Sequence, residues 1–254
     1  MIDIRDLSFS YHKETFFEHL RLTLSDGTLT ALIGENGAGK STLLKLVMGS
    51  EKADSGNIFL DGENMHSLKK SDIARRLSYF PQSRPTPDMS ALDVVLMGRY
   101  PYTKGRFSVP EKEILLAAQA MERMNVSHFA ERNVRTLSFG ERQRVYLAML
   151  LAQDTQNCLF DEPTNFMDVS AKFSMLDALS EMRNNGKCVL CVLHDLSLAM
   201  RYADRIIVMK DGLIFADGTP DALYQNGAIE KAFGIRLQKY ENEGERTYFA
   251  LPKK

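Results

Sequence analysis

Residues 34–42 read Gly34-Glu35-Asn36-Gly37-Ala38-Gly39-Lys40-Ser41-Thr42, which fits the phosphate-binding pattern G-x-x-x-x-G-K-[ST]. An apolar run at 29–33 precedes this loop, and an apolar segment at 43–47 with the character of a helix follows it. Three glycines let the loop bend tightly, so that backbone N–H groups turn inward around a phosphate, and the helix N-terminus adds further donors. Lys40 can reach the β- and γ-phosphates, while Ser41 offers a hydroxyl to Mg²⁺. The stretch therefore predicts a binding site for a nucleoside triphosphate.

The whole chain has the length and composition of a soluble globular protein. It holds 254 residues, 44% hydrophobic and 26% charged, which is enough for one domain with an additional lobe. The formal net charge of −1 gives no basic field, so no nucleic-acid partner is expected. The first residues are charged, and no apolar run approaches the roughly 18 residues that cross a bilayer. We therefore expect a cytoplasmic protein unless a partner holds it at a membrane.

Strand and helix signals alternate in the way that gives a parallel sheet in an α/β fold. Antiparallel strands are expected to flank the phosphate-binding unit, because Asp26-Gly27 and Asp61-Gly62 mark turns beside short strands. The expected strands are 19–24, 28–33, 57–60, 77–80, 158–160, 188–193, 205–209 and 213–216, with a helix over 169–183. The pattern predicts one domain over 1–254, with a core of 1–82 and 156–220, a helical insertion of 83–155 and a tail of 221–254.

Within the helical stretch, two features predict how helices begin and pack. Ser138 and Glu141 have the spacing of a capping box at the start of a helix. That helix carries Val145, Ala148, Met149 and Ala152 on one face. An earlier set near helical spacing is predicted to pack in the core: Ile114, Leu115, Ala118, Met121 and Met124.

Polar residues at the ends of three further strands form a second chemical group. Asp161 and Glu162 end one strand, where the first carboxylate can hold Mg²⁺ and the second can orient or deprotonate water. His194 ends the next strand, and Gln82 ends another. Because the carboxyl ends of parallel strands open onto the same crevice, we expect these residues to converge with Lys40 on one phosphate site.

Two strand positions need a separate interpretation. Cys188 and Cys191 form a C-x-x-C, but residues three apart on a strand face opposite sides, so we interpret both as packed core thiols rather than a redox or zinc pair. Three cysteines in all fit a reducing compartment. Asn157 stands where an apolar strand residue is expected.

Together with Leu137-Ser138-Phe139-Gly140-Glu141-Arg142-Gln143, these residues resemble the ATP-binding-cassette (ABC) family, whose signature is L-S-G-G-[QE]. The resemblance covers nearly the entire chain. It implies a P-loop NTPase (RecA-like) core with a mixed sheet, an antiparallel β subdomain and an inserted α-helical subdomain. It also implies an ATPase that uses ATP and Mg²⁺ and closes head to tail on a second copy of itself. Each ATP would then lie between the phosphate loop of one subunit and the signature of the other.

Family roles fall on individual residues of this sequence. Glu162 resembles the catalytic base, with Gln82 and His194 beside it. The remaining matches are Tyr11 for adenine stacking, 34–42 for the phosphates, Ser41, Gln82 and Asp161 for Mg²⁺, and Ser138, Gly140, Glu141 and Asp168 for the segments that meet the nucleotide at the dimer interface.

Two segments resemble one group of cassettes within the family. Leu96-Met97-Gly98-Arg99-Tyr100-Pro101-Tyr102 and the tail, with Phe233-Gly234-Ile235 and Tyr248-Phe249-Ala250-Leu251-Pro252, are similar to cassettes of iron-siderophore, haem and cobalamin importers. The resemblance implies uptake of an iron-siderophore-type compound, with haem or cobalamin as the alternative. Its partners would be an integral membrane permease and a substrate-binding protein, and its place the cytoplasmic face of the plasma (inner) membrane. Because 96–102 mixes apolar, aromatic and basic side chains, we expect Arg99 and Tyr100 to contact the permease.

Other functions are weighed against transport. A non-transport ABC ATPase of DNA repair or ribosomes is disfavoured, because only about a hundred residues separate the phosphate loop from a single signature. A regulatory subunit without turnover is disfavoured by Glu162 and His194. Phe139, which stands in place of a signature glycine, weakly favours it. Asn165-Phe166-Met167 also depart from the usual small residues, and both departures should line the dimer interface.

Overall fold

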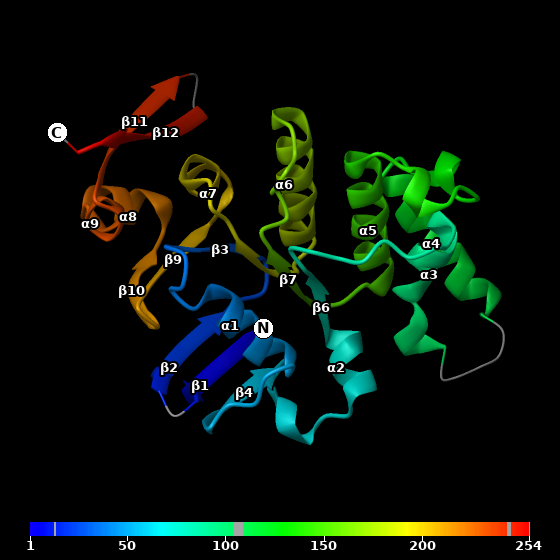
Figure 1. Cartoon of the computed structure of the whole chain (residues 1–254), viewed down its shortest axis with the longest axis horizontal. Coiled ribbons are helices and arrows are strands. Elements are labelled where there is room, and N and C mark those ends of the chain that lie inside the picture. The colour runs from blue at the N-terminus through cyan, green and yellow to red at the C-terminus, as the bar shows by residue number, and fades with distance from the viewer. Residues whose placement is uncertain (13, 104–108, 243–244, 254) are drawn as a thin grey trace.

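A central sheet in the order β10-β9-β3-β8-β7-β6 organises the molecule (Figure 1). The computed structural model describes residues 1–12, 14–103, 109–242 and 245–253. Strands β9, β3, β8, β7 and β6 run parallel, and β10 pairs antiparallel with β9 after the Asp211-Gly212 turn. The predicted mixed sheet of an α/β fold is confirmed. The strands are β3 (Thr28–Gly34), β6 (Leu77–Phe80), β7 (Asn157–Asp161), β8 (Cys188–Val192), β9 (Arg205–Lys210) and β10 (Leu213–Gly218).

An antiparallel sheet in the order β2-β1-β4-β5 packs beside the phosphate-binding unit, as predicted. The Asp61-Gly62 turn joins β4 to β5, with both residues in the left-handed conformation that tight hairpins need. The turn at Asp26-Gly27 instead carries the chain from β2 in this sheet to β3 in the central sheet. The strands are β1 (Ile2–Tyr11), β2 (Glu14–Leu24), β4 (Ser55–Leu60) and β5 (Glu63–Asn64).

Each face of the central sheet has its own hydrophobic core. One core joins the sheet to α1 (Lys40–Met48) and to the antiparallel strands. The other joins it to α6 (Val169–Asn184) and α7 (Leu196–Tyr202). Cys188 lies in the first core and Cys191 in the second, and both thiols are free, so the packed-core interpretation is confirmed.

Helices α3 (Ala91–Met97), α4 (Glu111–Arg123) and α5 (Phe139–Gln153) pack together at one end of the molecule (Figure 1). The Ser138–Glu141 capping box is present at the start of α5. The core prediction for Ile114, Leu115 and Ala118 is wrong, because these side chains are exposed. The buried face of α4 is offset from them and consists of Glu113, Ala117, Ala120 and Met121.

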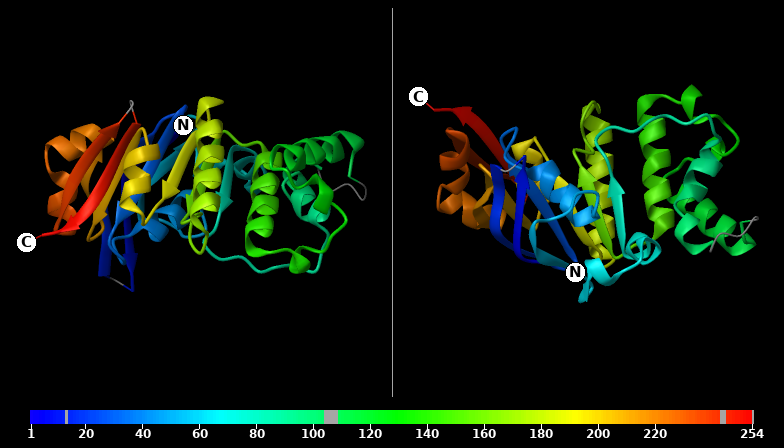
Figure 2. Two further views of the ribbon diagram at one scale, coloured as in Figure 1. Left: turned by 90° about the horizontal axis from the view of Figure 1, so that it is seen from above. Right: turned by 60° about the horizontal axis from the view of Figure 1, so that its bottom comes forward.

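The chain ends at the opposite end of the molecule from these helices (Figure 2). Helices α8 (Pro220–Gln225) and α9 (Ala228–Phe233) lead into a hairpin of β11 (Ile235–Asn242) and β12 (Glu245–Pro252). The hairpin packs on α7 through the buried Tyr248, whose carbonyl oxygen accepts a hydrogen bond of 2.6 Å from the Ser197 hydroxyl. Within the described ranges, no helix has the length and apolar character that a membrane span requires.

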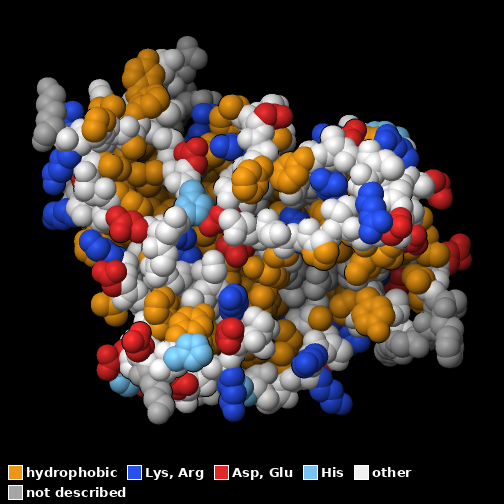
Figure 3. All heavy atoms as spheres, viewed as in Figure 1, with side chains coloured by type: hydrophobic (Ala, Val, Ile, Leu, Met, Phe, Trp, Pro, Cys, Tyr) orange, Lys and Arg blue, Asp and Glu red, His pale blue; other side chains and the backbone are white. Residues whose placement is uncertain are grey.

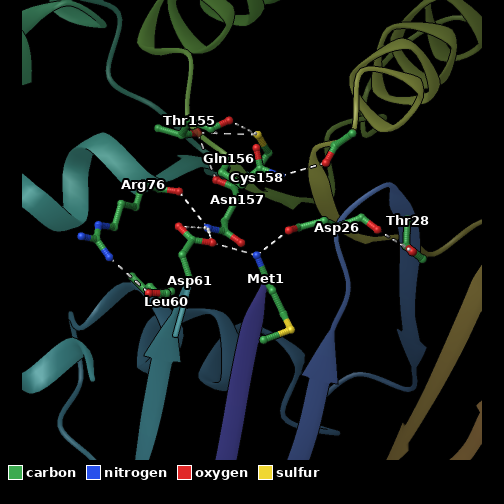
Figure 4. A network of polar contacts seen from close by, with 11 residues as sticks. Met1, Asp26, Thr28, Leu60, Asp61, Arg76, Thr155, Gln156, Asn157 and Cys158 are labelled. Carbon is green, nitrogen blue, oxygen red and sulfur yellow. Dashed lines mark hydrogen bonds and ion pairs between the residues drawn. The ribbon is translucent and has the colours of Figure 1, made fainter. Parts of the chain in front are cut away.

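The unexpected Asn157 joins the two sheets (Figure 4). Its Nδ2 donates to Oδ1 of Asp61 at 3.1 Å and to the carbonyl oxygen of Arg76 at 3.0 Å. Asp61 also accepts from the Met1 amine at 2.8 Å. The Nδ2 half of this buried amide is thus hydrogen-bonded, whereas Oδ1 has no partner among the described residues.

Candidate nucleotide site

The phosphate loop between β3 and α1 needs glycine at two crowded positions. Gly34 has φ 155°, and a Cβ there would lie 2.3 Å from the Met209 carbonyl oxygen. Gly39 has φ 107°, and a Cβ there would lie 2.8 Å from the ring of Phe16. The backbone can therefore turn into α1 only without side chains at these points.

Lys40, the first residue of α1, hydrogen-bonds to the backbone of the phosphate loop through its side chain. Its Nζ donates to the carbonyl oxygens of Gly34 at 2.8 Å and Glu35 at 2.9 Å. Burial lowers the pKa of Lys40, while the nearby Glu162 and Asp161 act in the opposite direction. A phosphate in the loop would offer this amine a stronger acceptor than a carbonyl.

A hollow of about 320 Å³ lies over the loop, between it and the antiparallel sheet. Tyr11 is half exposed beside the hollow, and its hydroxyl lies 3.2 Å from Oγ1 of Thr42. The rings of Tyr11 and Phe16 meet edge to face at 5.7 Å. The residues that line the hollow are Tyr11, Phe16, Asn36, Gly37, Gly39, Lys40, Ser41, Thr42 and Glu162.

Asp161 ends β7 with one carboxylate oxygen left free. The Tyr79 hydroxyl donates to Oδ2 at 3.1 Å, whereas Oδ1 is buried and has no hydrogen-bond partner among the described residues. Burial, aided by the charge of Glu162, raises the pKa of Asp161. A buried acceptor without a partner costs on the order of 1–3 kcal/mol. A free carboxylate oxygen within electrostatic reach of Lys40, the residue before Ser41, suits Mg²⁺, which is usually held by one or two carboxylates, waters and substrate phosphates.

Glu162 is held by side chains that follow two other strands and by one from its own loop. Gln82 Nε2 donates to its Oε2 at 2.5 Å, and Asn165 Nδ2 donates to the same oxygen. His194 Nε2 shares a hydrogen bond with Oε1. The Glu162 backbone has φ 51°, a strained conformation for a residue with a side chain, at a cost of about 1–3 kcal/mol. The carboxylate is thus fixed at the edge of the phosphate hollow.

The parallel strands bring these groups together, as predicted. Gln82, Asp161 with Glu162, and His194 follow the carboxyl ends of β6, β7 and β8, and the phosphate loop follows β3. Neighbouring strands in this order leave their ends at one edge of the sheet, where α/β proteins bind ligands.

The signature residues line a different hollow, of about 750 Å³, between the first turns of α5 and α6. In the described part of the chain it shares no lining residue with the phosphate hollow. Asp168 caps α6, because its Oδ1 accepts from the Ala171 N–H at 2.8 Å. Ser138, Gly140, Glu141 and Asp168 are therefore together, but apart from the phosphate loop of the same chain.

Phe16 and Tyr79 were missed in the sequence, and Asn165, which was expected to line the dimer interface, was not expected to contact Glu162. Tyr79 pairs with Leu159, two residues before Asp161, so strand alternation places it beside Asp161 once the register of β6 and β7 is known. Asn165 lies three residues after Glu162, so the sequence shows a hydrogen-bond donor close to this carboxylate. For Phe16 no local pattern gave a signal, because β2 approaches the loop from another sheet.

Comparison with known proteins identifies this arrangement. The family model described as "ABC transporter" matches residues 17–165, which include the phosphate loop, the signature stretch and the Asp161–Glu162 pair. The chain belongs to the ABC transporter family. It is 38% identical over 236 residues to the achromobactin transport ATP-binding protein CbrD of Dickeya dadantii (strain 3937), covering 92% of this chain and 88% of that protein.

A second relative of this ABC cassette is the ferric enterobactin transport ATP-binding protein FepC of Escherichia coli (strain K12). It is 36% identical over 250 residues, covering 97% of this chain and 92% of that protein. Among solved structures, the cassette is similar to MJ0796 in a dimeric post-hydrolysis state bound to ADP and Pi. The TM-score is 0.75 at 24% identity, covering 87% of this chain and 99% of that chain. That likeness shows the fold.

Proposed function

We propose that this cassette hydrolyses ATP to drive uptake of an iron-siderophore-type compound through a separate membrane permease. The observation that carries the proposal is the convergence of Gln82 and His194 on Glu162, which lines the phosphate hollow. The names of two relatives, which concern achromobactin and ferric enterobactin, favour a siderophore. Haem or cobalamin is the alternative cargo.

Within one chain, different residues would bind the phosphates, the adenine and Mg²⁺ and accept the proton of water. The amides of 34–42 and Lys40 bind the phosphates, and Tyr11 stacks on adenine. Ser41, Gln82 and Asp161 would hold Mg²⁺, which supplies charge stabilisation for the transferring phosphoryl group. Glu162 accepts the proton of the attacking water, and His194 keeps the carboxylate oriented. Gln82 and Asn165 both donate to Oε2 of Glu162, so a Gln82 that turned toward Mg²⁺ would leave this oxygen bonded to Asn165 alone.

A second copy of the chain would complete the site. In the first turn of α5 the Glu141 N–H donates to the Ser138 hydroxyl, whereas the N–H groups of Phe139 and Gly140 have no acceptor within the helix, and the helix dipole favours an anion there. Their separation from the phosphate loop of the same chain favours a γ-phosphate presented by another subunit. The dimeric solved cassette has the same fold. Ser138, Gly140, Glu141 and Asp168 are the residues we assign to this interface.

The permease would bind beside α3. Hydrophobic side chains gather on the right-hand, helical part of the face in Figure 3. Met97, the last residue of α3, is 53% exposed, and Tyr100, in the turn that follows, is 75% exposed. A groove of about 770 Å³ with largely apolar walls lies between α1, β4, α2 (Lys70–Arg76) and β6. Arg75 joins α2 to the segment of Tyr100 by donating to the Pro101 carbonyl oxygen at 2.9 Å. Through this surface the cassette would sit on the cytoplasmic face of the membrane, with the permease receiving cargo from a substrate-binding protein.

Replacement of the base tests the proposal. Glu162→Gln leaves Lys40 and the loop amides untouched, so MgATP binding should persist, while loss of proton transfer should lower turnover by roughly 10²–10⁴-fold. Because the variant binds MgATP but hydrolyses it slowly, it should elute as a dimer in gel filtration with MgATP. Glu63→Gln, which changes a surface carboxylate paired with Arg76, is the matched control. Wild-type turnover in Glu162→Gln would remove Glu162 from the base role.

A further inference from the structure

The loop between β6 and α3 contains an arginine that the hydrolysis site does not use. Arg84 lies two residues after Gln82, and its guanidinium stacks between two rings. Its Cζ is 3.5 Å from the ring centroid of Phe80 and 4.4 Å from that of Tyr146. Phe80 ends β6, whereas Tyr146 belongs to α5, so Arg84 bridges the central sheet and the helical part.

Hydrogen bonds at the same place join this loop to α5. Nη2 of Arg84 donates to Oε1 of Gln143 at 2.8 Å, and the Tyr146 hydroxyl donates to the Pro85 carbonyl oxygen at 3.1 Å. Gln143 closes the signature stretch and lines the same hollow as Ser138. The loop after Gln82 is therefore fastened to the first turns of the signature helix.

Toward the sheet, the contacts continue to the catalytic strand. The ring of Phe80 lies 5.5 Å from that of Phe160, centroid to centroid. Phe160 directly precedes Asp161 and Glu162. A continuous row of rings and one guanidinium thus connects β7 to α5.

The charge of Arg84 is not needed to fill this space. Among the residues that the structure describes, Nη1 is buried and has no hydrogen-bond partner. Burial lowers the pKa of Arg84 to about 10. Apolar side chains of similar volume commonly replace buried charges without loss of stability. The guanidinium is therefore better explained by the contacts that it makes on both sides than by packing.

We propose that Arg84 is a positioning residue that ties the segment of Gln82 to the signature helix α5. It holds Ser138 at a fixed place relative to Glu162, and a displacement of Gln82 moves α5 with it. This inference rests on the proposed function, because the position of the signature matters only if a second copy closes on it.

The substitution Arg84→Met tests the role, because methionine keeps the apolar stem and removes the charge and the donors. MgATP affinity of the isolated chain should stay within about twofold of wild type. Dimerisation with MgATP, measured by sedimentation equilibrium in the Glu162→Gln background, should weaken about tenfold, which corresponds to ~1.4 kcal/mol. With Glu162 intact, kcat should fall while KM for MgATP changes little. The melting temperature should be unchanged or higher.

Two further variants separate positioning from general damage. Arg5→Met removes another guanidinium stacked on a ring, that of Phe59 at 4.2 Å, in the antiparallel sheet, and should behave as wild type. Gln143→Leu removes the acceptor of the Arg84 bond. It should weaken dimerisation by itself but add nothing to Arg84→Met, since partners in one contact are not additive. If Arg84→Met does not fold, Gln143→Leu and Arg84→Lys carry the same comparison.

The outcomes distinguish this proposal from the proposed function. Dimerisation and kcat of Arg84→Met and Gln143→Leu equal to those of Arg5→Met would overturn the positioning role. So would additive effects of the two changes, or a loss of MgATP affinity as large as the loss of dimerisation. A failure of the wild type and of Arg5→Met to hydrolyse ATP would instead overturn the proposed function itself.

Discussion

Phe139 occupies the first position of α5, where its backbone is helical and its ring is partly exposed in the signature hollow. Phenylalanine would be strained at this position if the backbone had to adopt a left-handed φ, which glycine tolerates. The backbone of Phe139 is instead helical, so there is no such strain. Phe139→Gly therefore has no strain to relieve, and the Ser138 hydroxyl and the Gly140 N–H stay in place. We expect permease-stimulated turnover to change by less than about tenfold, measured as phosphate release. An inactive wild type rescued by Phe139→Gly would instead indicate a degenerate signature and a regulatory subunit.

Substitutions at Gly140, the next residue, should affect phosphate binding without affecting folding. A Cβ at Gly140 would meet nothing within 4 Å, so Gly140→Ala should fold normally in the isolated chain. An aspartate in the first turn of a helix is stabilising, because it faces the positive end of the dipole. Gly140→Asp should therefore keep or raise the melting temperature while it abolishes turnover by repelling the γ-phosphate. Turnover by Gly140→Asp equal to that of Gly140→Ala would exclude a phosphate from this helix end.

At the scale of elements, the segment from α3 into the 3₁₀ turn of Tyr100–Tyr102 combines two different roles. Arg99 was expected at the surface, and this expectation is wrong. Its side chain is 7% exposed, and its Nε donates to Oε2 of Glu113 on α4 at 2.6 Å. Tyr100 is exposed, as a contact residue should be. Only part of the segment is available to a permease.

The two neighbours should respond differently to substitution. Arg99→Glu would place two buried carboxylates together and should destabilise the cassette by roughly 3–5 kcal/mol, measured by urea unfolding. Tyr100→Ala should leave the unfolding midpoint unchanged and reduce co-purification with the permease and cargo uptake. If Tyr100→Ala retains both, the permease surface lies elsewhere.

Local patterns predicted the elements that depend on local physics. Strand β6 and the capping box of α5 follow from apolar runs and from the Ser138–Glu141 spacing, and both are observed. Ile114 and Leu115 were misplaced because an ion pair, Arg99 with Glu113, takes the core position that an apolar count assigns elsewhere. Asn157 and Arg84 gave no usable signal, since their partners lie 96 and 59 residues away in the sequence. Contacts between subdomains cannot be read from periodicity.

For the whole molecule, the central sheet divides the core into two layers that share its strands. Cys188 and Cys191 point into different layers from a single strand, and Cys158 lies on the neighbouring β7. All three thiols are fully buried, and burial raises the pKa of each, to about 12 for Cys188. Little thiolate therefore forms at neutral pH, and a thiol-reactive reagent from solvent cannot reach the three sulfurs unless the sheet opens.

The thiols should consequently report global unfolding. We expect the three cysteines of the chain to react with a chromogenic disulfide reagent in one phase, as slowly as the sheet opens. MgATP binds the native cassette, so at about 100 times its dissociation constant it should add ~2.7 kcal/mol of stability and slow the labelling roughly 100-fold. Lys40→Ala, which removes the amine from the phosphate loop, should lose most of this protection. A single thiol that reacts in its own fast phase, at a rate independent of MgATP, would mean that one layer opens without the other, and that the two cores are not one cooperative unit.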